Sequence, residues 1–232
     1  MVFIYVQELA RFLFGLKCFH FDLASIAIIE EDEQKIVVKL KGIQLEYANA
    51  LRRMCLNGIP VFAVDDVVII ENSSVFADEA LAHRLSMIPL KTDLSRFVEP
   101  SKCDCHSDTG CSNCRVLLMI DSGPPDTTRL VTSAELTSED EIVKPVSDKI
   151  PIIELAPGQK LKLEAYARLG RGTEHAKWNA SNVSVLTETD KEDEHILTIE
   201  SSGCLEPSQI VLSGINELAN RIDDFKQIIA AL

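Results

Sequence analysis

The feature that most constrains this chain is a long apolar stripe near its carboxyl terminus. Large apolar residues recur there at alternating intervals of four and three, as on a helix that packs lengthwise against another surface. The stripe consists of Val211, Ile215, Leu218, Ile222, Phe225 and Ile229. Gly203 and Pro207 precede it, and proline is accepted in the first turn of a helix. The spacing therefore predicts a carboxyl-terminal helix with a continuous apolar seam.

Two kinds of surface can cover such a seam. Most amphipathic helices face the core of their own chain, and this is the more common arrangement. A coiled-coil-like seam of nearly three heptads also suits a helix that is shared between subunits. Periodicity leaves both alternatives open.

Charge and composition exclude several classes of function. The 232 residues are 46% hydrophobic and 25% charged, which is ordinary for a globular protein. A net charge of −13 disfavours independent binding to nucleic acid, because neutralising phosphates requires clustered Lys and Arg. The sequence has no phosphate-binding glycine loop and no internal repeat, which argues against an enzyme. Protein partners are the expected ligands.

Residues 1–21 form the most apolar stretch and are interpreted as an amino-terminal extension of uncertain status. A membrane-spanning helix needs about 20 mostly apolar residues, and polar residues interrupt this stretch. No signal-peptide pattern is present, so we expect a cytoplasmic chain without a membrane anchor. The segment is a helix that packs on a partner, an ordinary core helix, or sequence upstream of the true start codon. One helical face carries Val2, Val6, Leu9, Leu13 and Leu16.

Several other segments have a clear periodicity. Residues 25–30 and 35–40 are rich in Ile and Val and flank an acidic turn, which predicts a hairpin. Apolar residues recur on one helical face over residues 44–56, and Gly58 and Pro60 end that helix. A short strand is expected at 67–70 and a short helix at 78–85. Alternating patterns predict strands at 161–167 and 195–200.

The region between residues 91 and 149 has a different composition. It is dominated by Cys, Asp, Ser, Thr and Pro, with strand-like islands at 116–120 and 128–132. This pattern predicts an inserted region built from short strands and loops.

Four cysteines lie within twelve residues of that region, at Cys103, Cys105, Cys111 and Cys114. Such crowding in a chain without a secretion signal favours a metal over disulfides. Zinc binds four thiolates tetrahedrally at about 2.3 Å, and a glycine such as Gly110 permits the necessary turn. A four-sulfur site has no open position, so the ion would be structural and would help fold the loop. An iron–sulfur cluster is the less favoured alternative.

The remaining polar residues do not predict catalysis. Glu79 and His83 are four residues apart on an expected helix, a spacing typical of a surface pair. Arg52 and Arg53 lie away from much of the apolar stripe of their helix, as on a solvated face or an interface. Trp178 follows a glycine-rich break and most often signals packing. Outside the four-cysteine loop, apolar surroundings predict small buried hydrophobes at Cys18, Cys55 and Cys204.

Several motifs together resemble a family of RNA polymerase components. The motifs are ANALRR at 48–53, LAHRL at 81–85, IPL at 88–90 and GTEHAKW at 172–178. They are similar to those of the D component of archaeal DNA-directed RNA polymerase, to the third-largest subunit of eukaryotic RNA polymerase II and, more distantly, to the amino-terminal domain of the bacterial alpha subunit. The two cysteine pairs match the zinc loop of the eukaryotic relative, with a slightly longer gap between them.

The resemblance implies an α+β fold in two domains. A discontinuous dimerisation domain, an antiparallel sheet plus two helices, would comprise residues 22–60 and 181–232. A mainly β domain of residues 61–180 would be inserted into it and would carry the metal loop 101–115. Some archaeal relatives hold an iron–sulfur cluster in a later insertion, but after residue 149 this chain has one cysteine, Cys204.

The implied function is non-catalytic assembly. The chain would form a heterodimer with subunit L, bind subunits N and P and the large catalytic subunits, and meet DNA only through the assembled complex. Burial of the six apolar seam residues would contribute on the order of 10 kcal/mol before entropy costs. The alternative is a free-standing zinc or iron–sulfur metalloprotein with a regulatory or redox role. The residues expected at the partner interface are Leu45, Asn49, Arg52, Arg53, Val211, Ile215, Leu218, Ile222, Phe225 and Ile229.

Overall fold

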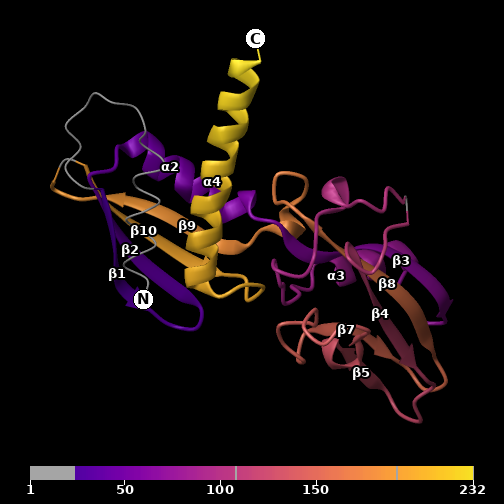
Figure 1. Ribbon diagram of the computed structural model, residues 1–232. Helices are drawn as coiled ribbons and strands as arrows, with labels where there is room; N and C mark the ends of the chain where they lie inside the picture. Colours follow the sequence, from indigo (N-terminus) through magenta and orange to yellow (C-terminus); the bar gives the residue numbers. More distant parts are fainter. Residues whose placement is uncertain (1–23, 108, 192, 232) are drawn as a thin grey trace. The chain divides into compact units, whose positions relative to one another are not determined.

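The computed structural model describes residues 24–107, 109–191 and 193–231, which divide into two compact units (Figure 1). Unit 1 combines the described residues up to Ile59 with Ser181–Ser202 and the chain from Glu206 onward. Unit 2 comprises Pro60–Ala180 and Gly203–Leu205. The expected domain boundaries differ from these units at Pro60 and at Gly203–Leu205. The amino-terminal extension, residues 1–21, lies outside the described residues.

Unit 1 contains a four-stranded antiparallel sheet in the order β1-β2-β10-β9. Its strands are β1 (Ser25–Glu31), β2 (Lys35–Lys41), β9 (Ser181–Glu188) and β10 (Glu194–Ser201). The predicted hairpin is confirmed as β1 and β2. The register places Val38 opposite Leu197 and Ile36 opposite Ile199, and all four side chains are buried. Because successive side chains of a strand point to opposite faces of the sheet, these residues form one apolar face, which the helices cover.

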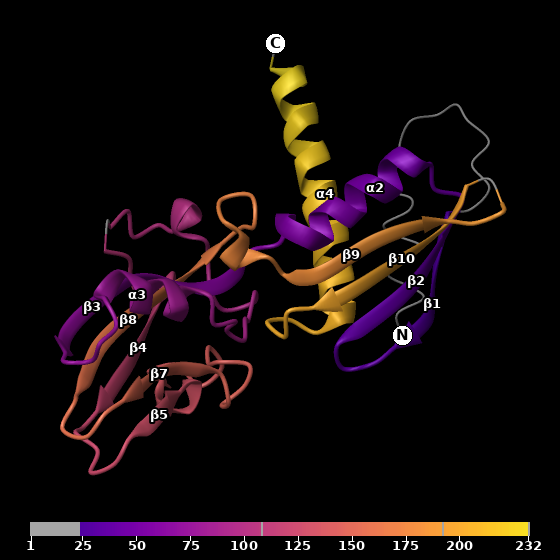
Figure 2. The same ribbon diagram turned by 180° about the vertical axis from the view of Figure 1, so that it is seen from behind.

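Two helices of unit 1 contact that sheet (Figure 2). Helix α2 (Leu45–Arg53) runs on into one π-helical turn, η1 (Met54–Gly58), and packs on β9 and β10. Helix α4 (Pro207–Ala230) contacts η1, β10 and β2. Both helices were expected, although the π-helical ending of the first was not. Their crossing point is Gly214, where an added Cβ would lie 2.7 Å from Sγ of Cys55.

Unit 2 is built on a second antiparallel sheet, in the order β3-β8-β4-β6, together with a two-stranded sheet of β5 and β7. Helix α3 (Asp78–Ser86) contacts β3 and β7. Its buried side chains Leu81 and Leu85 join a core that includes Phe62 and Leu118. The strands are β3 (Val61–Asn72), β4 (Arg115–Ser122), β5 (Arg129–Thr132), β6 (Thr137–Ser138), β7 (Pro151–Leu155) and β8 (Leu161–Gly170).

The secondary structure confirms the α+β class with an inserted, mainly β part that carries the cysteine loop. Strand β3 begins at Val61, well before the expected start at residue 67. Its first residues, Val61–Val64, are all buried, so the sequence there lacks the alternation of apolar and polar residues that indicates a strand. Strands β6, β7 and β9 were not predicted. Among the described helices, none combines the length and hydropathy that crossing a membrane requires.

Candidate metal centre and interaction faces

The four predicted ligands converge at one point of unit 2. The Sγ atoms of Cys103, Cys105, Cys111 and Cys114 all lie within 4.8 Å of one another. Three separations link the set: 3.7 Å from Cys103 to Cys111, 3.8 Å from Cys111 to Cys114, and 3.9 Å from Cys114 to Cys105. Four sulfurs placed tetrahedrally at about 2.3 Å from one zinc ion would be roughly 3.8 Å apart. The donor set therefore fits a single tetrahedral ion.

The backbone of the loop supports the same arrangement. The amide N–H of Cys111 donates to Sγ of Cys114 at 3.2 Å, and the amide N–H of Cys114 donates to the Cys111 carbonyl at 3.0 Å. Gly110 has a φ of +75°, and a Cβ there would lie 3.3 Å from Sγ of Cys114. A hydrogen bond from the backbone of Asn113, together with those from the neighbouring thiols, lowers the pKa of Cys111 to about 7, whereas burial raises the pKa of Cys114 to about 12.

An ion pair fixes the start of the loop. Glu99, which precedes the short helix η2 (Pro100–Lys102), accepts hydrogen bonds from Nε and a terminal nitrogen of Arg171 at 2.8 and 2.6 Å. Burial would raise the pKa of Glu99, but the hydrogen bonds from Arg171 and Lys102 outweigh it and lower the pKa to about 2. This two-point geometry holds the loop to the end of β8.

A second cluster of interactions fixes the end of the loop. Arg115 directly follows Cys114, and its guanidinium lies 3.9 Å from the centre of the Tyr166 ring. It also forms an ion pair with Asp66 at 3.1 Å. Asp66 and Tyr166 are paired residues of β3 and β8. Both ends of the cysteine loop are therefore anchored to the rigid sheet. Sequence reasoning missed both anchors, because ion pairs between distant segments leave no local periodic signal.

The other described cysteines are packing residues. Cys55 and Cys204 are buried, as expected for small apolar side chains, and burial raises the pKa of Cys55 to about 12. Trp178, in the short helix η4 (Ala176–Trp178), is also buried, and its indole N–H donates to the Arg168 carbonyl at 3.3 Å. Glu79 and His83 are exposed on α3. Within the described part of the chain, these cysteine, tryptophan, glutamate and histidine side chains do not come together as a catalytic site.

The predicted seam of α4 changes its surroundings along the helix. Val211 is only 5% exposed because the first turns of α4 pack inside unit 1. Ile215, Leu218 and Ile222 are half-buried. Near the carboxyl-terminal end, Phe225 and Ile229 are 62% and 54% exposed. Ile228, which the periodicity did not single out, is 63% exposed. We call the segment from Ile215 to Ile229 the open seam.

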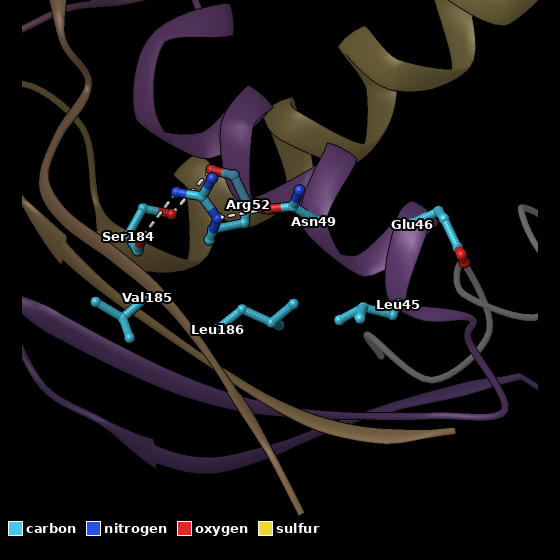
Figure 3. A pocket seen from close by; sticks show the side chains of 7 residues that line it. All are labelled: Leu45, Glu46, Asn49, Arg52, Ser184, Val185 and Leu186. Carbon is cyan, nitrogen blue, oxygen red and sulfur yellow. Dashed lines mark hydrogen bonds between the residues drawn. The ribbon is translucent and has the colours of Figure 1, made fainter. Parts of the chain in front are cut away.

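Three of the four α2 residues of the predicted interface, Leu45, Asn49 and Arg52, line an open hollow of about 550 Å³ (Figure 3). Leu45 faces Val185 and Leu186 of β9 across it. Nε of Arg52 donates a hydrogen bond to Oδ1 of Asn49 at 2.9 Å. A terminal nitrogen of the same Arg52 side chain donates to the Ser184 carbonyl at 3.3 Å. Arg52 therefore covers a carbonyl at the edge of the sheet. Arg53 does not line the hollow and is exposed.

The β9 residues of this hollow were missed by sequence reasoning. The available signal was the β-branched content of residues 183–187, which is typical of a strand. The structure brings Leu45, Asn49 and Arg52 together with β9, whereas the exposed residues at the far end of α4 do not line the hollow.

Comparison with known proteins identifies the family of this chain. The family model described as the RNA polymerase Rpb3/RpoA insert domain matches residues 67–202, more than half of the chain. The chain therefore belongs to the Rpb3/RpoA insert domain family.

Individual relatives are archaeal proteins named DNA-directed RNA polymerase subunit Rpo3. The chain is 45% identical to the one from Methanosphaera stadtmanae over 159 residues, which are 68% of this chain and 58% of that protein. The identity is 44% to the protein of Pyrococcus furiosus, over 66% of this chain and 55% of the relative. It is 43% to that of Archaeoglobus fulgidus, over 70% and 60%. The matched part of the chain thus spans less than two thirds of the length of these relatives.

Proposed function

We propose that this chain is a non-catalytic assembly subunit of a DNA-directed RNA polymerase and that the polymerising chemistry resides in other chains. The observation that carries this proposal is the open seam of α4 on a member of the Rpb3/RpoA insert domain family. The archaeal relatives bear the name of an RNA polymerase subunit, which agrees with it. Such a subunit works in the cytoplasm and meets DNA only through the assembled complex.

The proposed primary partner is subunit L, in a heterodimer on which subunits N and P and the large catalytic subunits assemble. The side chains of Phe225, Ile228 and Ile229 are on average about 60% exposed to solvent. Full burial of such a side chain contributes about 1.5–3 kcal/mol, so covering these three contributes about 4 kcal/mol. This is less than the free energy expected from burying all six seam residues. Val211 is already buried within its own unit, and Ile215, Leu218 and Ile222 are half-buried.

The second helix completes the proposed interface. Leu45, Asn49, Arg52 and Arg53 lie on α2, which contacts α4 within unit 1. The apolar rim of the hollow, at Leu45, Val185 and Leu186, offers a further surface for another chain of the complex. Contacts at this face would add to the free energy of the seam.

We further propose that the cysteine loop holds one structural zinc ion. A single ion suits four sulfurs that all lie within 4.8 Å of one another, with three separations of 3.7–3.9 Å, whereas a cluster needs them farther apart because its thiolates bind different iron atoms. When bound, zinc would link the two cysteine pairs and stabilise a loop that has little apolar core of its own. Native mass spectrometry with elemental analysis tests this proposal: one zinc per chain supports it, and iron with inorganic sulfide contradicts it.

Purification of the chain with and without subunit L tests the assembly role. Light scattering after size exclusion should give a stable one-to-one heterodimer when both chains are present. Without the partner, the exposed apolar seam should cause poor recovery through non-specific aggregation, without a defined homodimer. A well-behaved monomer that ignores subunit L would contradict the proposal and favour a free-standing metalloprotein.

A further inference from the structure

The charges beside the open seam are distributed unevenly. Ile215, Ile222 and Ile229 occupy heptad positions a, and Leu218 and Phe225 occupy positions d. Arg221 then occupies a flanking position g and Lys226 a flanking position e. No other residue at positions e and g of this stretch is charged. The acidic residues of the same stretch fall at positions b and c, farther from the seam: Glu217, Asp223 and Asp224.

This pattern is not a consequence of overall composition, because the chain carries a net charge of −13. Arg221 is exposed. The side chain of Lys226 is 58% exposed, and its Nζ lies 2.9 Å from Oδ1 of Asp223 on the same helix. That contact neutralises part of the Lys226 charge, so Arg221 presents the stronger positive charge to a partner.

We infer that the open seam selects a partner helix with acidic residues at its own flanking positions. This inference rests on the proposed assembly function and specifies the chemistry of the partner at that same face. Residues at e and g approach the partner helix beside the apolar seam and set partner choice through charge pairs. Carboxylates at those positions would pair with Arg221 and Lys226 in either helix orientation.

The same charges oppose pairing between two copies of this chain. In a parallel pair, position g of one helix meets position e of the following heptad of the other, which would place Arg221 against Lys226. In an antiparallel pair, g meets g and e meets e, so a cation again meets a cation. Like charges in contact are destabilising, and this repulsion favours a heterodimer over a homodimer.

Two synthetic helical peptides provide a direct test with the full-length chain. Both carry Ile at every a position and Leu at every d position; one has Glu at all e and g positions, and the other has Lys there. Like charges suppress self-association of each peptide, so both are available to bind. At low salt the acidic peptide should bind on the order of tenfold more tightly than the basic one. The difference should shrink near 1 M salt because the charges are screened.

A charge-reversed variant sharpens the test. Arg221→Glu combined with Lys226→Glu should invert the preference between the two peptides. The control is Lys91→Glu with Lys149→Glu, two exposed lysines of unit 2, which changes net charge equally and should leave the preference intact. Circular dichroism confirms that each variant keeps its helix content.

The outcomes separate the two levels of the proposal. Equal binding of both peptides, or a preference that the charge reversal does not move, refutes the charge selection while leaving the docking face intact. Binding of neither peptide refutes the docking face itself and, with it, the proposed assembly role of α4.

Discussion

The close approach of α4 to η1 makes Gly214 the most informative position for a stability test. A Cβ at this position would lie 2.7 Å from Sγ of Cys55 and 3.5 Å from Cδ1 of Leu51. Carbon and larger atoms prefer separations of about 3.5–4.0 Å. The Cys55 side chain is fully buried and cannot move aside freely. Gly214→Ala therefore forces the helix or the thiol out of position.

The expected magnitude follows from two opposing terms. Overpacking a filled core costs about 1–3 kcal/mol. Alanine gains about 1 kcal/mol over glycine inside a helix. Gly214→Ala should therefore destabilise the packing of α4 by about 1 kcal/mol. In a Cys55→Ala background the clash disappears, and the same substitution should instead stabilise the helix by about 0.5–1 kcal/mol.

Amide hydrogen exchange, read by mass spectrometry on peptides from α4, measures this local stability in the intact chain. A loss of 1 kcal/mol corresponds to about fivefold faster exchange. Peptides from β8 in unit 2 should not change, and Asn216→Ala, at an exposed site on the same helix, should slow exchange by the same small factor in both backgrounds, because it changes only helix propensity. Equal effects of Gly214→Ala in both backgrounds would refute the close approach to Cys55.

The metal site and its anchor give two further predictions. Cys105→Ser should abolish stoichiometric zinc binding in native mass spectrometry, whereas Cys204→Ser should retain one ion; retention by both would show that the four thiols are not the ligands. Glu99 has a pKa lowered from 4.5 to about 2 in the folded chain, so its pair with Arg171 stabilises above pH 4.5 and this contribution disappears as the pH falls towards 2. A shift of that size is at most about 3 kcal/mol, which screening reduces to about 1–2 kcal/mol, so Glu99→Gln should lower the thermal midpoint at pH 7 and lose its effect near pH 2. A difference that stays constant from pH 7 to pH 2 would contradict this assignment.

The elements with strong local patterns could be predicted from the sequence. The heptad spacing predicted α4, and the Ile- and Val-rich segments predicted the hairpin of β1 and β2. The four clustered cysteines predicted one compact thiol group, since short loops confine their ends. Motifs in α2 and α3 supported the family resemblance, which the match to residues 67–202 bears out.

Features that depend on packing could not be predicted in the same way. The seam spacing does not reveal that Val211 is covered by its own unit while Ile229 stays exposed, because periodicity is identical at both positions. The first part of β3 lacks alternation since Val61–Val64 are buried on both faces. The anchor between Glu99 and Arg171 joins residues far apart in the chain, and only the fold brings them together.

The proposal that α4 is an assembly surface is tested most directly by one matched pair of substitutions. Ile229, in the open seam, and Leu130, on β5 of unit 2, are similarly exposed at 54% and 52%. Isothermal titration of subunit L should show that Ile229→Asp weakens binding by at least tenfold, whereas Leu130→Asp leaves affinity unchanged. Unchanged binding by Ile229→Asp, or an equal loss in both variants, would contradict the assembly role of the open seam.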